Sequence, residues 1–160
     1  MDPRPRVELV EMTDHLRSAF RQGPRQLGLA LGLLVPDGWP EYPEALLSAA
    51  TPGWPFFLFV DPTQAAILGG GGFLCAPDDK NEVQVGYEVA PIHRGRGVAT
   101  NAMKQVLAAR TSAMPVAVTY SDTGHSVAVL RKLGFSPIGT HRLPDSATVW
   151  MWAKLANAAT

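Results

Sequence analysis

Alternation of apolar and polar residues predicts a first strand at residues 7–12, with the sequence VELVEM. The segment TDHLRSAFRQ that follows is predicted to be a helix, because Leu16 and Phe20 lie four positions apart on one helical face. Thr13 precedes this helix and is a suitable N-cap. A short strand followed by an amphipathic helix therefore opens the chain.

Two further helices are predicted before residue 55, separated by a proline-rich loop. The first lies in the apolar run at 27–35, although that run contains two glycines. The second is PEALLSAA at 43–50, where the leading proline suits the first turn of a helix. The prolines of the intervening VPDGWPEYP indicate an irregular connection.

Three segments rich in β-branched and aromatic residues come next, at 56–60, 65–76 and 82–90. Short turns separate them, which favours antiparallel neighbours in a sheet. Four consecutive glycines at 69–72 lie inside the second segment. Glycine inside a strand indicates a β-bulge or close backbone packing, and no Gly-Lys-Ser/Thr follows to make this a phosphate-binding P-loop.

The last third of the chain alternates helix and strand before a final pair of strands at 135–141 and 147–155. A strand at 115–120 separates the two helices. The first helix has an apolar stripe at helical spacing, made of Val98, Ala102, Val106 and Ala109. The second helix is predicted to be capped by Thr123, to end at Gly134 and to turn inward Val127, Leu130 and Leu133.

These elements predict an α+β fold. The central sheet would be mixed but mostly antiparallel, with about seven strands and helices on both faces. At 160 residues the chain is most simply one domain, long enough to bury a core without disulfides or metals.

Composition narrows the classes of partner. Lys+Arg and Asp+Glu both number 14, so no overall field attracts a polyanion, and a nucleic-acid partner is not expected. The longest apolar run is too short to span a bilayer, so no membrane partner is expected either. The only cysteine, Cys75, lies in an apolar run and is interpreted as a small core residue. A cytoplasmic protein is therefore expected, and the oligomeric state stays open, with a homodimer as one option.

The segment PIHRGRGVAT at 91–100 stands between a predicted strand and a predicted helix. Glycine there leaves backbone N–H groups exposed at the start of the helix, where the helix dipole also favours an anion such as pyrophosphate. A tight turn with two solvated arginines is the alternative interpretation. A dinucleotide fingerprint would need a third glycine at Thr100, and the preceding antiparallel strands also argue against it.

Two motifs in this order resemble a known family. Arg94-x-x-Gly97-x-Ala99 is similar to the Q/R-x-x-G-x-G/A signature of the GNAT superfamily, the acyl-CoA-dependent N-acetyltransferases. Downstream, TGHSVAVLRKLGF resembles the second motif of that family, with Thr123 where asparagine is usual. The resemblance covers residues 55–155, the expected acyl-CoA-binding core, whereas residues 1–54 carry no signature and are expected to shape the acceptor side.

The resemblance implies acetyl-CoA as co-substrate and no metal. The backbone of Val89 would pair with the pantetheine arm, and Thr123 and Ser126 would lie beside that arm, although helix capping explains these two equally. The residues implied to hold the pyrophosphate form one continuous loop: Arg94, Gly95, Arg96, Gly97, Val98, Ala99 and Thr100. His93, beside this loop, is expected to be exposed.

Acetyl transfer to an amine needs a group that takes the ammonium proton. Period-2 alternation places Glu82, Gln84 and Glu88 on one face of their strand. The resemblance places the family's usual carboxylate at or beside Gln84, which makes Glu82 the candidate base, directly or through a water, with Glu88 in reserve. A solvated strand carboxylate is the alternative for each.

The proton for the leaving thiolate has no clear donor. Many relatives have a tyrosine where this chain has Leu130, which lies on the apolar stripe and cannot donate. Tyr120, Tyr87 or Ser126 are the candidate substitutes, and the sequence does not choose among them.

The acceptor is expected to be an unidentified amine of a small molecule, protein or peptide. The loop PDGWPEYPE at 36–44 combines aromatic and acidic residues, and Trp54 follows nearby, which would suit a cationic amine. A surface loop whose acids precede a helix is the alternative. Two functions remain: an N-acetyltransferase, or a non-catalytic acyl-CoA-binding domain that lost its acid, as Leu130 suggests.

Overall fold

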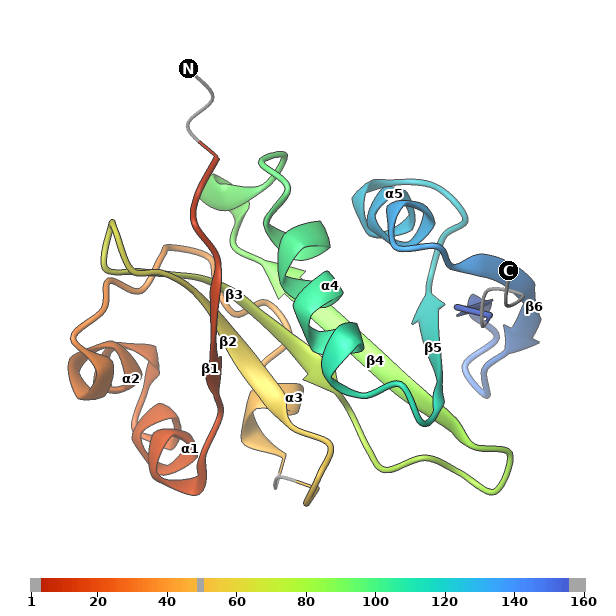
Figure 1. Ribbon diagram of the computed structural model, residues 1–160, viewed down its shortest axis with the longest axis horizontal. Helices are drawn as coiled ribbons and strands as arrows, with labels where there is room; N and C mark the ends of the chain where they lie inside the picture. Colours follow the sequence, from red (N-terminus) through yellow and green to blue (C-terminus); the bar gives the residue numbers. More distant parts are fainter. Residues whose placement is uncertain (1–3, 49–50, 156–160) are drawn as a thin grey trace.

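The computed structural model describes residues 4–48 and 51–155. Seven strands form one sheet in the order β1-β2-β3-β4-β5-β7-β6 (Figure 1). All neighbours are antiparallel except β4 and β5, which are parallel. The predicted α+β class with a mixed, mostly antiparallel sheet is confirmed. The strands are β1 Glu8–Glu11, β2 Phe56–Asp61, β3 Ala66–Phe73, β4 Glu82–Val89, β5 Met114–Thr119, β6 Ser136–Arg142 and β7 Thr148–Ala153.

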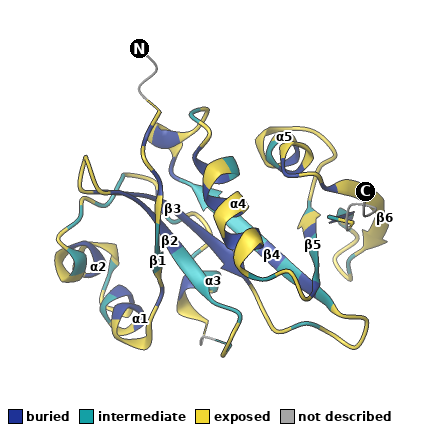
Figure 2. Cartoon of the chain, in the orientation of Figure 1, coloured by how far each residue is buried: buried dark blue, intermediate teal, exposed yellow. Residues whose placement is uncertain are grey.

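The helices form a layer on each face of the sheet, as expected. One apolar core includes Val98 and Met103 of α4 and Leu130 of α5. The other includes Leu16 of α1 and Leu46 of α3, packed on β2 and β3. Figure 2 shows buried stripes on α1 and α4 and exposed residues on their outer surfaces. The helices are α1 Asp14–Arg21, α2 Pro24–Leu31, α3 Glu44–Leu47, α4 Val98–Ala109 and α5 His125–Lys132, with a short 3-10 helix, η1, at Pro91–His93.

The glycines of β3 lie where the sheet is most tightly packed, and every residue of this strand is buried. A β-bulge interrupts the β2–β3 register, since Phe59 pairs with Gly69 and Val60 pairs with Ile67. A Cβ added to Gly69 would lie 2.1 Å from the Glu88 carbonyl oxygen. One added to Gly71 would lie 2.8 Å from the Tyr87 Cβ. The bulge and the close packing predicted from the glycine run are both confirmed.

Several local predictions agree with the structure. The Thr13 side chain accepts a hydrogen bond from the Leu16 N–H at 3.3 Å, which confirms Thr13 as an N-cap. The apolar run at 27–35 is helical only as far as Leu31, because Gly32 adopts a left-handed conformation and ends the helix. In the predicted helix at 43–50, the described part is α3, and residues 49–50 lie outside the described residues.

Other local predictions are wrong. Cys75 is exposed rather than part of the core, because β3 ends at Phe73 and the chain turns toward β4. Ala109 is also exposed, since the buried stripe of α4 ends at Leu107. Within the described ranges, no helix is long and apolar enough to cross a membrane.

The glycine packing gives a stability prediction. Gly69→Ala should lower the free energy of unfolding by about 1–3 kcal/mol, because its Cβ would overlap backbone atoms that cannot move aside. Gly86→Ala is the matched control, because the three atoms nearest to its Cβ would belong to the flexible Leu74 side chain, at 3.2 Å or more. Urea unfolding of both variants would measure the difference. Equal stability of the two variants would contradict the close packing of β3.

Candidate functional site

β4 and β5 diverge after a short paired segment, which leaves a gap that we call the β4–β5 splay. Their pairing runs only from Glu82 with Met114 to Gln84 with Val116. The other edge of β4 stays paired with β3, where the Gln84 carbonyl accepts from Leu74 at 2.9 Å. Because backbone groups alternate along a strand, those of Tyr87 and Val89 face the splay. This stretch of β4 therefore offers a strand edge that an extended ligand could pair with.

Two helices begin beside the splay, and each starts at a glycine (Figure 1). Gly97 is the N-cap of α4, with φ 77°, and Gly124 is the N-cap of α5, with φ 105°. Neither N-cap makes a side-chain hydrogen bond to its helix. The first N–H groups of both helices thus have no capping side chain, and they carry the positive end of the helix dipole.

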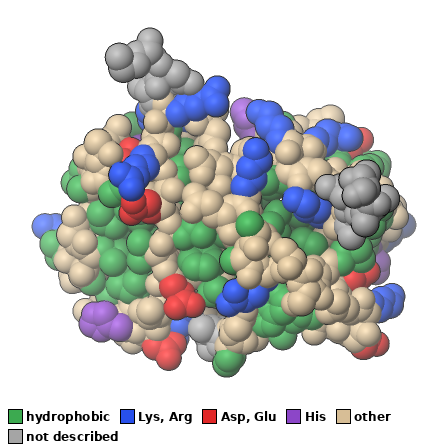
Figure 3. Space-filling model, viewed as in Figure 1, with side chains coloured by type: hydrophobic (Ala, Val, Ile, Leu, Met, Phe, Trp, Pro, Cys, Tyr) green, Lys and Arg blue, Asp and Glu red, His purple; other side chains and the backbone are tan. Residues whose placement is uncertain are grey.

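The loop before α4 has the conformation that its glycines predicted. Gly95 and Gly97 have φ of 73° and 77°, and a Cβ on either would meet nothing within 4 Å. Glycine is needed there for the left-handed backbone, and the space around the loop is open. The Arg94 Nε donates to the Val89 carbonyl at 3.1 Å and so fixes the loop to the end of β4. Figure 3 shows basic side chains gathered around α4 and α5 on this face.

Ser126 and Tyr87 meet across the splay. The Tyr87 hydroxyl donates to the Ser126 backbone carbonyl at 2.7 Å, which joins β4 to α5, and burial raises the pKa of Tyr87 well above its usual value. Thr123 lies just before α5, but it does not cap the helix as predicted. Its hydroxyl instead lies 3.1 Å from that of Ser121, because Gly124 takes the N-cap position. Leu130 is buried, as expected.

The two candidate bases, Glu82 and Glu88, share with Gln84 the face of β4 that points away from α4. Val83 and Val85 alternate with them and are buried in the core under α4 and α5. Glu82 lies where β4 and β5 are still paired, whereas Glu88 lies near the other end of the strand. Six residues of strand place these two Cα atoms roughly 20 Å apart. One small acceptor therefore cannot use both carboxylates as its base.

Glu88 fixes the segment at 36–44 to the sheet. One carboxylate oxygen accepts from the Glu41 N–H and the other from the Tyr42 N–H, at 2.5 and 3.0 Å. The Glu41 carboxylate in turn lies 3.8 Å from the Arg94 guanidinium. These contacts connect the predicted acceptor-side loop, β4 and the glycine loop.

His93 is buried in η1, so the expectation of an exposed histidine is wrong. The 3-10 turn folds the ring inward, and the Nδ1 atom has no hydrogen-bond partner among the described residues. Burial and the nearby Arg96 charge lower the pKa of His93, and the Asp61 carboxylate opposes them. The buried ring is therefore favoured in its neutral form.

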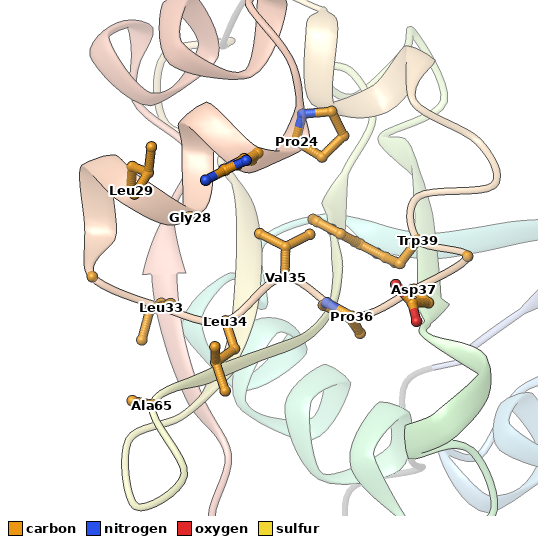
Figure 4. A pocket seen from close by; sticks show the side chains of 13 residues that line it. Pro24, Gly28, Leu29, Leu33, Leu34, Val35, Pro36, Asp37, Trp39 and Ala65 are labelled. Atoms are coloured by element: carbon orange, nitrogen blue, oxygen red, sulfur yellow. The ribbon is translucent and has the colours of Figure 1, made fainter.

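Two hollows lie on the side of the molecule formed by α1, α2 and α3. The larger, about 730 Å³, is lined by α2 and by the segment at 32–39, which face one another in Figure 4. The smaller, about 320 Å³, lies between α1, α3 and the ends of β2 and β3. In the described part of the chain, no cluster of three or more His, Cys, Asp or Glu side chains could hold a metal.

One residue of the smaller hollow is absent from the sequence predictions. Arg17 lines it, and only 2% of its surface is exposed. The sequence did contain a signal, because residue 17 falls on the helical face of Leu16 and Phe20, where an apolar side chain is expected.

Comparison with known proteins agrees with this geometry. A family profile described as Acetyltransferase (GNAT) domain matches residues 36–136. No curated protein sequence is significantly similar to the chain.

Many solved structures share the fold. A Bordetella pertussis protein assigned to the GnaT acetyltransferase family is 25% identical with a TM-score of 0.54, and the match covers 64% of this chain and 66% of that one. Apo RimL, the ribosomal L7/L12 alpha-N-protein acetyltransferase, is 19% identical with a TM-score of 0.64, over 97% and 93% of the two chains. Spermidine N-acetyltransferase from Vibrio cholerae, in complex with CoA and spermine, is 14% identical with a TM-score of 0.54, over 64% and 65%. The matches span just under two thirds of the Bordetella and Vibrio chains.

The contacts of Glu88 give a prediction that does not depend on turnover. Glu88→Gln should lower the free energy of unfolding by about 1–2 kcal/mol, because the new amide can accept from only one of the two N–H groups. Hydrogen exchange at Glu41 and Tyr42 should speed up. Glu82→Gln is the control and should leave both exchange rates unchanged. Unchanged exchange in Glu88→Gln would show that Glu88 does not anchor this segment.

Proposed function

The chain belongs to the GNAT acetyltransferase family, and we propose that it moves an acetyl group from acetyl-CoA to the amine of a small molecule, protein or peptide. The β4–β5 splay carries this proposal, because it combines an unpaired strand edge with two helix starts that lack capping side chains. An extended arm that ends in phosphates needs both features.

The residues present fit acetyl-CoA. We propose that the N–H groups of the loop at 94–100 and of the first turn of α4 bind the pyrophosphate, with Arg94 and Arg96 adding positive charge. The backbone of Val89 would pair with the pantetheine arm, on the side of β4 that faces the splay. Its carbonyl already accepts from Arg94, but a carbonyl oxygen has a second lone pair, and the Val89 N–H faces the same way. Thr123 and Ser126 would lie beside that arm, and Ser126 already meets Tyr87 across the splay.

In the proposed reaction, the neutral amine attacks the thioester carbonyl, the new C–N bond forms, and the C–S bond breaks. The acceptor ammonium must first lose a proton, and the departing thiolate must gain one. Glu82 is the base that we propose, acting through water. It lies three residues from Val85, where the splay opens, which is roughly 10 Å along the strand. Glu88 is less suited, because each of its carboxylate oxygens already accepts an N–H.

No described side chain is clearly placed to give a proton to the leaving thiolate. The Tyr87 hydroxyl is engaged with the Ser126 carbonyl, and Leu130 is buried. The Ser126 hydroxyl and the exposed Tyr120 are the remaining candidates. This lack of a dedicated acid favours the second candidate function, a non-catalytic acyl-CoA-binding domain.

The acceptors of the structural neighbours indicate which amines to test in an acetyl-transfer assay. RimL acts on a protein α-amine and the Vibrio enzyme on spermidine, so the panel should hold peptides, polyamines and amino acids. Thiol release from acetyl-CoA in the presence of one of these amines would support the transferase. Acetyl-CoA binding without thiol release from any amine would favour the binding domain.

The cofactor site gives a binding prediction. Thr100→Glu should weaken acetyl-CoA binding about tenfold or more, because it puts a negative charge beside the proposed pyrophosphate site. A glutamate in the first turn suits a helix, so the fold should persist. Ala108→Glu adds the same charge at the exposed far end of α4 and serves as the control. Calorimetry that finds equal affinities for the two variants would remove the loop from the binding site.

The base gives a prediction about pH. Glu82→Gln should lower kcat/KM by about 10²-fold or more well below the pKa of the acceptor amine, and the loss should shrink as pH rises and free amine accumulates. Affinity for acetyl-CoA should not change. Asp79→Asn removes a nearby exposed carboxylate and controls for charge alone. Wild-type rates for Glu82→Gln at every pH would mean that the acceptor arrives neutral and that the enzyme acts by positioning.

A further inference from the structure

Arg17 is a charged side chain inside the apolar layer formed by α1, α2 and α3. Its neighbours on the buried face of α1 are Leu16 and Phe20, and only 2% of its surface is exposed. Burial of a guanidinium costs free energy unless its N–H groups are paired. An arginine at this position therefore calls for a reason beyond packing.

The protein satisfies Arg17 only in part. Nη1 lies 2.7 Å from an Asp14 carboxylate oxygen, and Nη2 donates to the Met12 carbonyl at 3.2 Å. The buried Nε has no hydrogen-bond partner among the described residues. Its ion-pair partner is itself 94% exposed, so water weakens that attraction. The Nε–H is thus a desolvated, charged donor left without an acceptor.

The same side chain lines the smaller hollow, of about 320 Å³. Trp54, Phe56 and Phe73 supply apolar surface there, and Glu44 and Ser48 supply polar groups. A small concave site with apolar surface and a few polar groups is typical of ligand pockets. The volume suits a group about as large as one amino acid.

Two residues that line the hollow also contact β4, the strand beside which acyl transfer is proposed. Leu74 lines it and also covers Gly86, since a Cβ at Gly86 would lie 3.2 Å from Leu74 Cδ1. Tyr42 lines it too, and its N–H is held by Glu88. Leu74 and Tyr42 therefore connect the hollow with the part of β4 that carries Gly86 and Glu88.

We propose that this hollow binds a carboxylate of the acceptor through Arg17, so that the acceptor is an amine that also carries a carboxylate, such as an amino acid. This inference rests on the proposed function. The Arg17 guanidinium lines the hollow, and a ligand carboxylate there would pair with it, because planar groups of opposite charge pair well. The Glu44 carboxylate in the same wall would disfavour a doubly charged phosphate.

The test compares acids with their amides. The probes are L-phenylalanine, L-leucine and L-methionine, each paired with its primary carboxamide, and O-phosphoethanolamine as the phosphate-bearing amine. Wild-type protein saturated with CoA should gain thermal stability with the acids and much less with the amides. With acetyl-CoA, the acids should be acetylated with a kcat/KM at least about tenfold higher than the amides.

Variants assign the preference to Arg17. Arg17→Met should abolish it, because the positive charge is lost, and Arg17→Lys should weaken it, because an ammonium lacks the planar fork of a guanidinium. Circular dichroism should confirm folding. Arg21→Met removes an exposed arginine one turn along α1 and should keep the preference. If Arg17→Met does not fold, the comparison of acids with amides in the wild type and in Arg17→Lys still tests the proposal. Equal treatment of acids and amides by the wild type, in binding and in turnover, would overturn the inference, as would a preference for O-phosphoethanolamine.

The two proposals fail in different ways. Acids that stabilise the protein without thiol release from any amine would contradict the transferase and leave the carboxylate site in place. Acetylation of amides or polyamines as fast as acids, with no stabilisation by any acid, would support the transferase and contradict the carboxylate site.

Discussion

The loss of pairing between β4 and β5 is the constraint on which the site depends. A strand inside a sheet has both edges occupied, yet β4 has a β5 partner only as far as Gln84. The separation is maintained from both sides. β5 pairs with β7 over Val116 to Thr119, and Tyr87 reaches across to the Ser126 carbonyl of α5. Buried strand edges need partners, so this edge favours an extended ligand that supplies the missing hydrogen bonds.

The glycines of β3 allow β4 to pair closely with β3 on one edge while its other edge faces the splay. β4 must lie close to β3 while its outer groups face the splay, and at Gly69 the approach leaves no room for a Cβ. Glu88 then reaches from β4 to the segment at 36–44, whose Glu41 lies near Arg94 of the glycine loop. The proposed acceptor side and the proposed cofactor loop are therefore connected through one strand rather than through separate elements.

The sequence predicted the elements well because their signals are local. Strand alternation, the Thr13 cap and the glycine loop before α4 all depend on neighbouring residues, and all agree with the structure. The errors lie at the ends of elements, where Thr123 does not cap α5 and where burial was assigned wrongly. Cys75 and His93 lie just after strands, where one turn of backbone decides whether a side chain faces the core or solvent. The proposed catalytic roles rest on distances to substrates, which no local pattern encodes.

Arg17 shows how a violated pattern can be informative. A charge on the apolar face of α1 lowers stability unless it is paired, and the protein leaves its Nε–H without an acceptor. Glu88 and Arg17, the two charged groups on the proposed acceptor side, differ in whether the fold supplies all their hydrogen-bond partners. Glu88 accepts two backbone N–H groups and is satisfied within the fold, so its role is to fix the segment at 36–44. Arg17 is not satisfied within the fold, and this difference is why recognition of a ligand is assigned to the arginine and support of the site to the glutamate.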